Sequence, residues 1–284
     1  MIPNQALEEA AAAASRLIDA LTPNTSPSGA SLTVVGTGIR AIAQLTLESL
    51  AAMRSAEVLL HVIGEPVQEE ALLAINPAAC TMTQFYGDGL DRSATYEAMV
   101  EQVLASLAQG RRTVAAFYGH PGVFTYPSHE SVRRARAAGY PARMLPAVSA
   151  EDCLFADLGV DPGDGCQSYE ATDFLYLRQH VDPMAHLFLW QVGTLSNWTY
   201  ESGGYDMSTF PQLVGKLLQI YPATHPVTVY EASFRPEGRA RVVRLPLAWL
   251  DASQVTPATT LHIPPVPVAS GRPGYLWPGH QRAA

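Results

Sequence analysis

The sequence is poor in cysteine and has no long apolar run. Its three cysteines, Cys80, Cys153 and Cys166, are odd in number and match no zinc-ligand spacing, so thiols in a reducing compartment explain them best. No stretch of 18 apolar residues occurs, and therefore no membrane span is expected. No basic segment followed by an apolar core marks a secretory signal. These absences favour a cytoplasmic protein.

Charge is also scarce. Charged residues make up 15% of the 284 residues, against 48% hydrophobic residues, and the net charge is −8. A disordered chain has fewer apolar and more charged residues, so most of this chain is expected to fold. An acidic balance disfavours nucleic acid as a partner, because phosphate binding needs a basic face, and it disfavours a polybasic membrane anchor. The arginines between Arg111 and Arg136 are better explained as solvated surface positions than as a basic patch.

The first half of the sequence alternates strand and helix patterns. A helix over residues 4–21 and a Pro/Ser/Gly linker (Pro23–Ser31) make residues 1–30 an expected N-terminal extension. From Ser31 the run SLTVVG is typical of a strand buried on both faces. The alternation predicts an α/β domain over residues 31–147 with a mostly parallel sheet. Its other expected strands span residues 57–63, 81–85, 111–119 and 142–148, and its expected helices span 46–55, 65–75, 93–109 and 128–138.

The second half is richer in strands. The segments SYEAT, LFLWQVG, PVTVYEA, RVVRLPL and TTLHIPP all have strand patterns, and only residues 210–221 strongly predict a helix between them. A second α/β domain with a mixed sheet is therefore expected over residues 148–268, followed by a tail over residues 269–284. No internal repeat is visible.

Two glycine-containing segments follow buried strands in the first domain. VVGTGIR holds Gly36 and Gly38 but has Ala41 where a third glycine would complete GxGxxG, so a plain strand-to-helix turn explains it nearly as well as a ligand loop. In FYGHPGVF, two glycines and Pro121 break a strand, and aromatic side chains and His120 surround the break. Ligands bind at the carboxyl ends of such strands. For this segment a binding function is favoured over a tight core turn.

Two further groups of polar residues are ambiguous from spacing alone. Tyr86 lies in a glycine turn, and Arg92 and Tyr96 share one helix face if a helix begins near Arg92. A guanidinium lowers the pKa of a nearby tyrosine from about 10, but a packed tyrosine and a surface arginine are the simpler explanation. Ser149 precedes a short helix, and a role as an ordinary helix cap explains it as well as a contact to a cofactor does. Gln191 in an apolar strand needs partners, which a nucleobase or the backbone can supply.

Taken together, VVGTGIRAIAQLTLESL, FYGHPGVF, LPAVSAED, YEATDFL and LWQVG resemble the tetrapyrrole-methylase-like superfamily, and within it the borosin peptide α-N-methyltransferases, which methylate backbone amides of a ribosomally made peptide. The similarity spans roughly residues 31–266. It implies a two-domain tetrapyrrole-methylase-like fold with S-adenosylmethionine in the cleft between the domains, and a homodimer. The cofactor-binding residues that it implies are Gly36, Tyr118, His120, Val123, Phe124, Ser149, Ala150, Gln191, Ala232, Thr259 and Thr260.

The resemblance also changes the interpretation of the tyrosine/arginine group. Tyr86, Arg92, Tyr96 and Tyr118 match, in order and spacing, a borosin cluster that faces the peptide. An amide nitrogen is a poor nucleophile until its proton is removed and charge moves to oxygen, so the site needs a base and an oxyanion stabiliser. The expected base is Tyr86 or Tyr96, with Arg92 stabilising the charge and Tyr118 orienting the amide.

One feature departs from the fungal enzymes, which carry their substrate fused at the C-terminus. The residues after Val266 are few and contain no Val/Ile-rich core peptide, so we expect a separate precursor peptide, methylated in trans. Three alternatives stay open. A tetrapyrrole C-methyltransferase would have a GDP-type motif in place of GHPG. A nicotinamide enzyme would need the missing third glycine. A non-catalytic peptide-binding protein on a methylase scaffold would bind peptide without methylating it.

Overall fold

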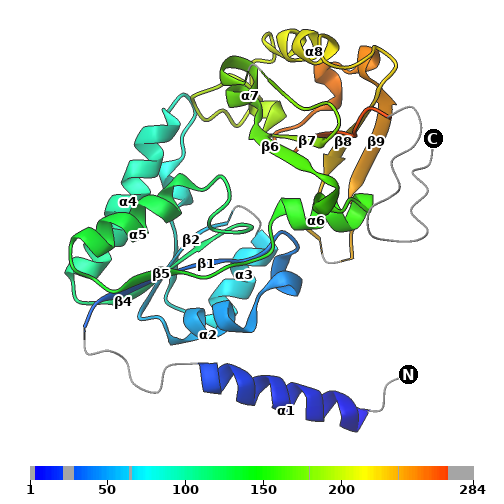
Figure 1. The fold of residues 1–284 in the computed structure, drawn as a ribbon. Helices are drawn as coiled ribbons and strands as arrows, with labels where there is room; N and C mark the ends of the chain where they lie inside the picture. The colour runs from blue at the N-terminus through cyan, green and yellow to red at the C-terminus, as the bar shows by residue number, and fades with distance from the viewer. Residues whose placement is uncertain (1–3, 22–28, 64–65, 179, 236, 268–284) are drawn as a thin grey trace. The chain divides into compact units, whose positions relative to one another are not determined.

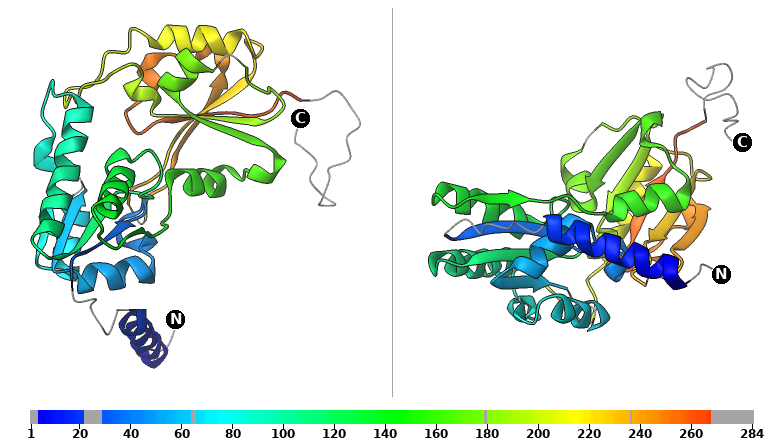
Figure 2. Two further views of the ribbon diagram at one scale, coloured as in Figure 1. Left: turned by 60° about the vertical axis from the view of Figure 1, so that its left-hand side comes forward. Right: turned by 90° about the horizontal axis from the view of Figure 1, so that it is seen from below.

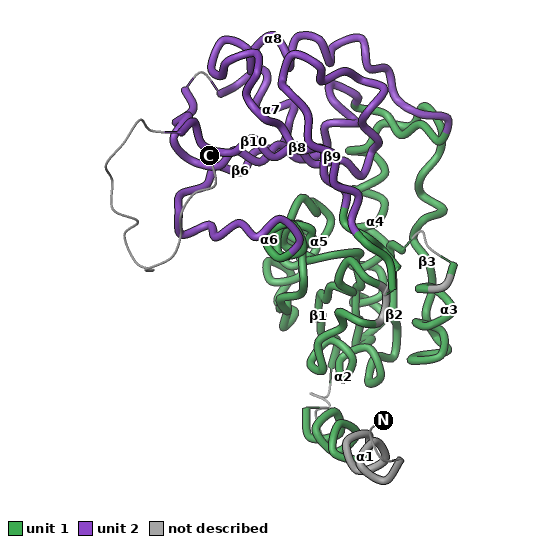
Figure 3. Tube along the Cα trace, turned by 90° about the vertical axis from the view of Figure 1, so that its right-hand side faces the viewer, with its two compact units in different colours: residues 1–156, 198–202, 232–239 green, residues 157–197, 203–231, 240–284 purple. Residues whose placement is uncertain are grey.

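The computed structural model describes residues 4–21, 29–63, 66–178, 180–235 and 237–267. Most of the expected linker and the tail over residues 269–284 therefore lie outside the described residues. The chain forms two compact units (Figure 3). Unit 1 comprises residues 1–156, 198–202 and 232–239, and unit 2 comprises residues 157–197, 203–231 and 240–284. The domain limits expected at residues 31, 147 and 268 stay predictions.

Unit 1 contains a sheet of parallel strands in the order β3-β2-β4-β1-β5 (Figure 1). The strand expected over residues 81–85 was wrong in its extent, because residues 83–85 form a 3-10 turn. The Thr81 hydroxyl accepts a hydrogen bond from the amide of Thr83 at 3.1 Å, a local bond that ends the strand. The strands are β1 (Ser31–Gly36), β2 (Val58–Val62), β3 (Ala79–Thr81), β4 (Arg112–Phe117) and β5 (Ala142–Met144).

Helices cover both faces of this sheet (Figure 2). On one face α4 (Arg92–Ala108) and α5 (Tyr126–Ala137) pack against the sheet, and on the other α2 (Leu47–Ser55) and α3 (Pro66–Ile75) do so. Burial of apolar side chains on both faces explains why these strands read as continuous hydrophobic runs. The further helices α1 (Asn4–Leu21) and α6 (Ala150–Leu158) lie at the two ends of this part of the chain.

Unit 2 contains a mixed sheet in the order β6-β7-β10-β8-β9, as expected, with β6 and β7 parallel and the other neighbours antiparallel. One helix was missed, because the Glu170 carboxylate ends β6 by accepting the amide of Asp173 at 2.8 Å and so starts α7. The strands are β6 (Cys166–Glu170), β7 (His186–Trp190), β8 (Pro226–Glu231), β9 (Arg241–Pro246) and β10 (Thr260–Ile263), and the helices are α7 (Ala171–Leu177) and α8 (Phe210–Leu218).

Short 3-10 helices complete the described secondary structure of both units. They are η1 (Ala41–Gln44), η2 (Thr83–Phe85), η3 (Pro162–Asp164), η4 (Val192–Thr194), η5 (Leu247–Trp249) and η6 (Ala252–Gln254). Among the described residues, no helix has the length and apolar character that crossing a membrane requires.

The buried His262 makes the stability of unit 2 depend on pH. Its Nε2 lies 2.8 Å from Nδ1 of His186, and burial, with smaller contributions from His186 and Arg244, lowers its pKa to about 3. The unfolded chain titrates near about 6.5, so between these values it binds a proton that the folded chain does not. We expect the free energy of unfolding to fall as the pH is lowered through this window, with a slope of up to about 1.4 kcal/mol per pH unit from this residue.

Urea unfolding at several pH values between 7 and 4 checks this prediction. His262→Gln should flatten the slope over that range, whereas His129→Gln, at an exposed histidine, should leave it unchanged. Equal slopes for the wild-type chain and His262→Gln would contradict the assignment.

Candidate active site

The two glycine segments of unit 1 meet at the carboxyl ends of β1 and β4. Gly38 and Gly119 exchange backbone hydrogen bonds of 3.2 and 3.0 Å, and Thr37 donates to the carbonyl of Phe117 at 2.9 Å. Gly38 and Gly119 both have positive φ, 73° and 71°, a conformation that glycine adopts without steric cost. VVGTGIR and FYGHPGVF therefore form one structure, although 80 positions separate their glycines.

Gly36 is where three loops approach most closely. A Cβ atom at this position would lie 2.1 Å from the carbonyl oxygen of Gly119 and 2.6 Å from Cβ of Ala147. Ala147 belongs to the chain that follows β5, whose Leu145 amide bonds to the carbonyl of Val34 at 2.8 Å. The absence of a side chain at Gly36 is thus a packing requirement, and it leaves the backbone of β4 and β1 in direct contact.

In the GHPGVF loop, His120 bonds to the loop backbone and Phe124 has a strained backbone conformation. His120 Nδ1 accepts the amide of Gly122 at 2.9 Å, and its carbonyl accepts the amide of Val123 at 3.1 Å. Because Nδ1 is an acceptor, the neutral imidazole carries its proton on Nε2. Phe124 has φ of 50°, uncommon for a bulky residue, and its side chain is 48% exposed. Backbone strain of this kind is common at ligand sites.

Ser149 caps α6. Its Oγ accepts the amide of Asp152 at 3.1 Å, and the Asp152 carboxylate accepts the amide and hydroxyl of Ser149 at 2.7 Å each. This reciprocal pair is a capping box with aspartate at the third position. Gln44, which the sequence did not single out, connects the GTG loop to α6. Its Oε1 accepts the amide of Ile39 at 2.8 Å and its Nε2 donates to Cys153 Sγ at 3.3 Å.

The first turn of α4 presents Arg92 and Tyr96. The helix begins at Arg92, one residue before the expected start at residue 93, and Asp91 caps it by accepting the amide of Ser93 at 2.7 Å. Arg92 Nε donates to the carbonyl of Thr199 at 3.2 Å. Tyr96 and Tyr86 both pack at the edge of the core under α4 and α5.

Two tyrosines outside the expected tyrosine/arginine group contact it. The ring of Tyr200 lies 5.1 Å from that of Tyr86, and the ring of Tyr126 lies 6.3 Å from that of Tyr96. Tyr126 opens α5 two residues after Phe124, so it joins the α4 group to the GHPGVF loop. Its hydroxyl donates to Glu97 at 2.6 Å, and that hydrogen bond raises the pKa of Tyr126. This shift disfavours the phenolate form of Tyr126.

The remaining predicted residues lie elsewhere in the chain. Gln191 was expected in a strand, but this was wrong. β7 ends at Trp190, and Gln191 follows it in the left-handed region with φ of 58°. Thr259, buried at the start of β10, donates its hydroxyl to Glu231 at 2.6 Å, and Thr260 is buried beside it. These three residues belong to unit 2, whereas Ala232, which directly follows β8, belongs to unit 1.

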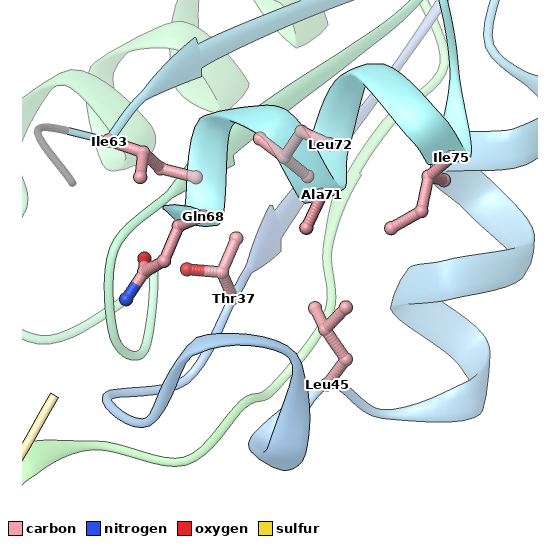
Figure 4. Close-up of a pocket in the computed structure, with 7 residues that line it drawn as sticks. All are labelled: Thr37, Leu45, Ile63, Gln68, Ala71, Leu72 and Ile75. Carbon is pink, nitrogen blue, oxygen red and sulfur yellow. The ribbon is translucent and has the colours of Figure 1, made fainter. Parts of the chain in front are cut away.

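A small pocket in unit 1 lies beside the GTG loop (Figure 4). Gln68 is only 5% exposed, and its amide has no hydrogen-bond partner among the described residues. None of the predicted site residues lines this pocket, although Thr37 directly follows Gly36. The pocket is mainly apolar, and its lining comprises Thr37, Leu45, Ile63, Gln68, Ala71, Leu72 and Ile75.

Comparison with known proteins decides the family. The model of the family described as tetrapyrrole (corrin/porphyrin) methylases matches residues 31–250. The chain belongs to this family. The fold of this chain is similar to the crystal structure of uroporphyrin-III-C-methyltransferase from Thermus thermophilus, with a TM-score of 0.59 and 21% identity over 83% of this chain and 92% of the other. The expected fold class is confirmed.

Curated relatives of the chain also confirm the borosin resemblance. The chain is 40% identical over 247 residues to the methyltransferase/ribosomally synthesized cyclic peptide gymnopeptides precursor of Gymnopus fusipes, which covers 85% of this chain and 59% of the relative. It is 38% identical over 239 residues to the methyltransferase/type III borosin cyclic peptide precursor of Anomoporia bombycina, covering 82% of this chain and 28% of the relative. The chain thus spans less than two thirds of the length of either relative.

Proposed function

We propose that this chain transfers methyl groups from S-adenosylmethionine to backbone amides of a ribosomally made precursor peptide, supplied as a separate chain. The 40% identity to a methyltransferase/cyclic peptide precursor supports the reaction class. The stacking of Tyr96 on Tyr126 carries the proposal, because it brings the tyrosine/arginine group beside the GHPGVF loop.

Side chains and backbone around Gly36 fit the methyl donor. Gly36 and Gly119 approach each other with no side chain between them, and Phe124 offers an exposed ring at a positive φ. S-adenosylmethionine, when bound, supplies an electrophilic methyl group, whose bond to sulfur breaks as the amide nitrogen takes the methyl. The residues that we propose to hold it are Gly36, Tyr118, His120, Val123, Phe124, Ser149, Ala150, Gln191, Ala232, Thr259 and Thr260.

The tyrosine/arginine group is proposed to activate the amide. Tyr86 or Tyr96 takes the N–H proton of the peptide bond as a phenolate. Arg92 stabilises that phenolate beforehand and the negative carbonyl oxygen afterwards, since a guanidinium favours the charged form of both. Tyr118 orients the amide, so that nitrogen and methyl carbon lie in line. Tyr126, kept protonated by Glu97, does not compete for the proton.

Mass analysis of the full chain incubated with S-adenosylmethionine and a precursor peptide from a neighbouring reading frame tests the proposal. We expect the peptide mass to rise in steps of one methyl group and the mass of the chain to stay constant. A mass gain on the chain itself would contradict action in trans. Methylation of a precorrin in place of the peptide would favour a tetrapyrrole C-methyltransferase, and tight peptide binding with no product would favour a binding protein.

The homodimer implied by the borosin resemblance remains a prediction, as does the cytoplasmic location. Light scattering on the purified chain checks the first of these, with a mass of twice the monomer expected.

A further inference from the structure

Residues 198–202 belong to unit 1, although the segments on either side of them in the sequence belong to unit 2 (Figure 3). The segment 198–202 pairs with the residues that lead into α4. The amide of Arg92 donates to the carbonyl of Trp198 at 3.0 Å, and the amide of Tyr200 donates to the carbonyl of Leu90 at 2.9 Å. Asp91 and Thr199 face each other as an antiparallel bridge.

Side-chain hydrogen bonds also hold the end of the segment 198–202. Ser202 donates its amide and its hydroxyl to the two carboxylate oxygens of Asp88, at 2.6 and 2.8 Å. The amide of Gly89 adds a bond of 2.9 Å to the carbonyl of Tyr200. A connection that only led from Asn197 to Gly203 would need none of these partners, so the segment is placed here by specific contacts.

These contacts fall on the residues that we propose to activate the amide. The carbonyl of Thr199 accepts Arg92 Nε at 3.2 Å. A guanidinium is planar and rigid, so fixing Nε also fixes the plane in which its terminal nitrogens donate. The ring of Tyr200 packs on that of Tyr86 at 5.1 Å and 44°, a tilted arrangement that aromatic pairs favour. One short segment therefore constrains both the cation and one candidate base.

We propose that Trp198–Ser202 is a positioning segment for amide activation, in which the Thr199 carbonyl orients Arg92 and the Tyr200 ring orients Tyr86. This inference rests on the proposed function. The segment does not take part in proton transfer. It holds the guanidinium and the phenol in place to meet the charge that develops on the amide, and small displacements of such groups cost about 100-fold in rate.

Steady-state methylation of the precursor peptide by the full chain tests the role of Tyr200. For Tyr200→Ala we expect kcat to fall at least about tenfold, with the peptide KM and the Kd for S-adenosylmethionine within about twofold of wild type. The ascending limb of the kcat–pH profile should move to higher pH, because a Tyr86 phenol that the Tyr200 ring no longer holds is stabilised less as a phenolate by Arg92. Tyr200→Phe keeps the ring and should restore both kcat and the profile.

Two further variants keep the result interpretable. Tyr176→Ala removes an exposed tyrosine of unit 2 and should behave as wild type. Asp88→Ala removes only the exposed anchor of Ser202 and should lower kcat in the same direction as Tyr200→Ala, so it carries the test if Tyr200→Ala does not fold.

The outcomes separate this inference from the function on which it rests. An unchanged kcat and pH profile in the folded Tyr200→Ala, or in Asp88→Ala where that variant carries the test, would overturn the positioning role. Equal losses in Tyr200→Phe and Tyr200→Ala would also overturn it, since the hydroxyl would then be the essential group. If the wild-type chain yields no methylated peptide, the proposed function itself fails.

Discussion

Tyr96→Phe and Arg92→Ala are expected to bind S-adenosylmethionine with wild-type affinity and to lose methyl transfer. Removal of a general base costs about 10²–10⁴ in rate, and loss of a charge-stabilising donor costs about 10²–10³. Both residues lie on the first turn of α4, where Arg92 bonds to Thr199 and Tyr96 stacks on Tyr126. Neither change removes a residue that we propose to hold the methyl donor. Donor affinity should therefore stay the same while turnover falls.

Isothermal titration with S-adenosylmethionine and single-turnover methylation of the peptide measure the two properties. Tyr140→Phe is the matched control, because Tyr140 packs at the edge of the same core and carries no proposed role. Tyr86→Phe decides which tyrosine is the base, since only the variant that removes the base should lose the full factor. Near-normal turnover in both Tyr96→Phe and Arg92→Ala would refute the assignment of this group.

Periodicity and buried β-branched runs were sufficient to predict the two sheets, because their signals lie within single strands. The start of α4 was predicted to within one residue, at residue 93 instead of Arg92. Local side-chain bonds escaped the prediction. The Thr81 hydroxyl ends β3 early, and Glu170 turns the end of a strand into the start of α7. Both are single hydrogen bonds that change no hydrophobic pattern.

The candidate site was predictable only where a motif was continuous in sequence. FYGHPGVF marked a strand end by its glycines and Pro121, and the structure joins it to the GTG loop through Gly38 and Gly119. Tyr200 lies 114 positions from Tyr86, in a stretch with no periodic pattern, so no local signal relates them. Contacts such as that between Tyr86 and Tyr200 depend on the path of the whole chain, and no short stretch of the sequence predicts them.

Gly36→Ala is expected to destabilise unit 1 strongly and to abolish binding of the methyl donor. The added Cβ would lie 2.1 Å from the carbonyl oxygen of Gly119 and 2.6 Å from Cβ of Ala147, so backbone as well as side chain must move. Overpacking of this kind costs about 1–3 kcal/mol, and more where rigid backbone is displaced. We expect about 3 kcal/mol at least, because β1 and β4 are neighbouring strands joined by six register pairs.

Thermal and urea unfolding measure the loss of stability, and a thermal shift with S-adenosylmethionine measures donor binding. Gly203→Ala is the control, since a Cβ there has no neighbour within 4 Å, and both its stability and its thermal shift should match wild type. The steric cause also predicts a rescue. Because the collision with Ala147 involves a side chain, Ala147→Gly should recover part of the stability of Gly36→Ala, whereas the collision with the Gly119 carbonyl should persist. A Gly36→Ala chain with wild-type stability would mean that β1, β4 and the chain after β5 do not meet at Gly36, and the proposed donor site would lose its centre.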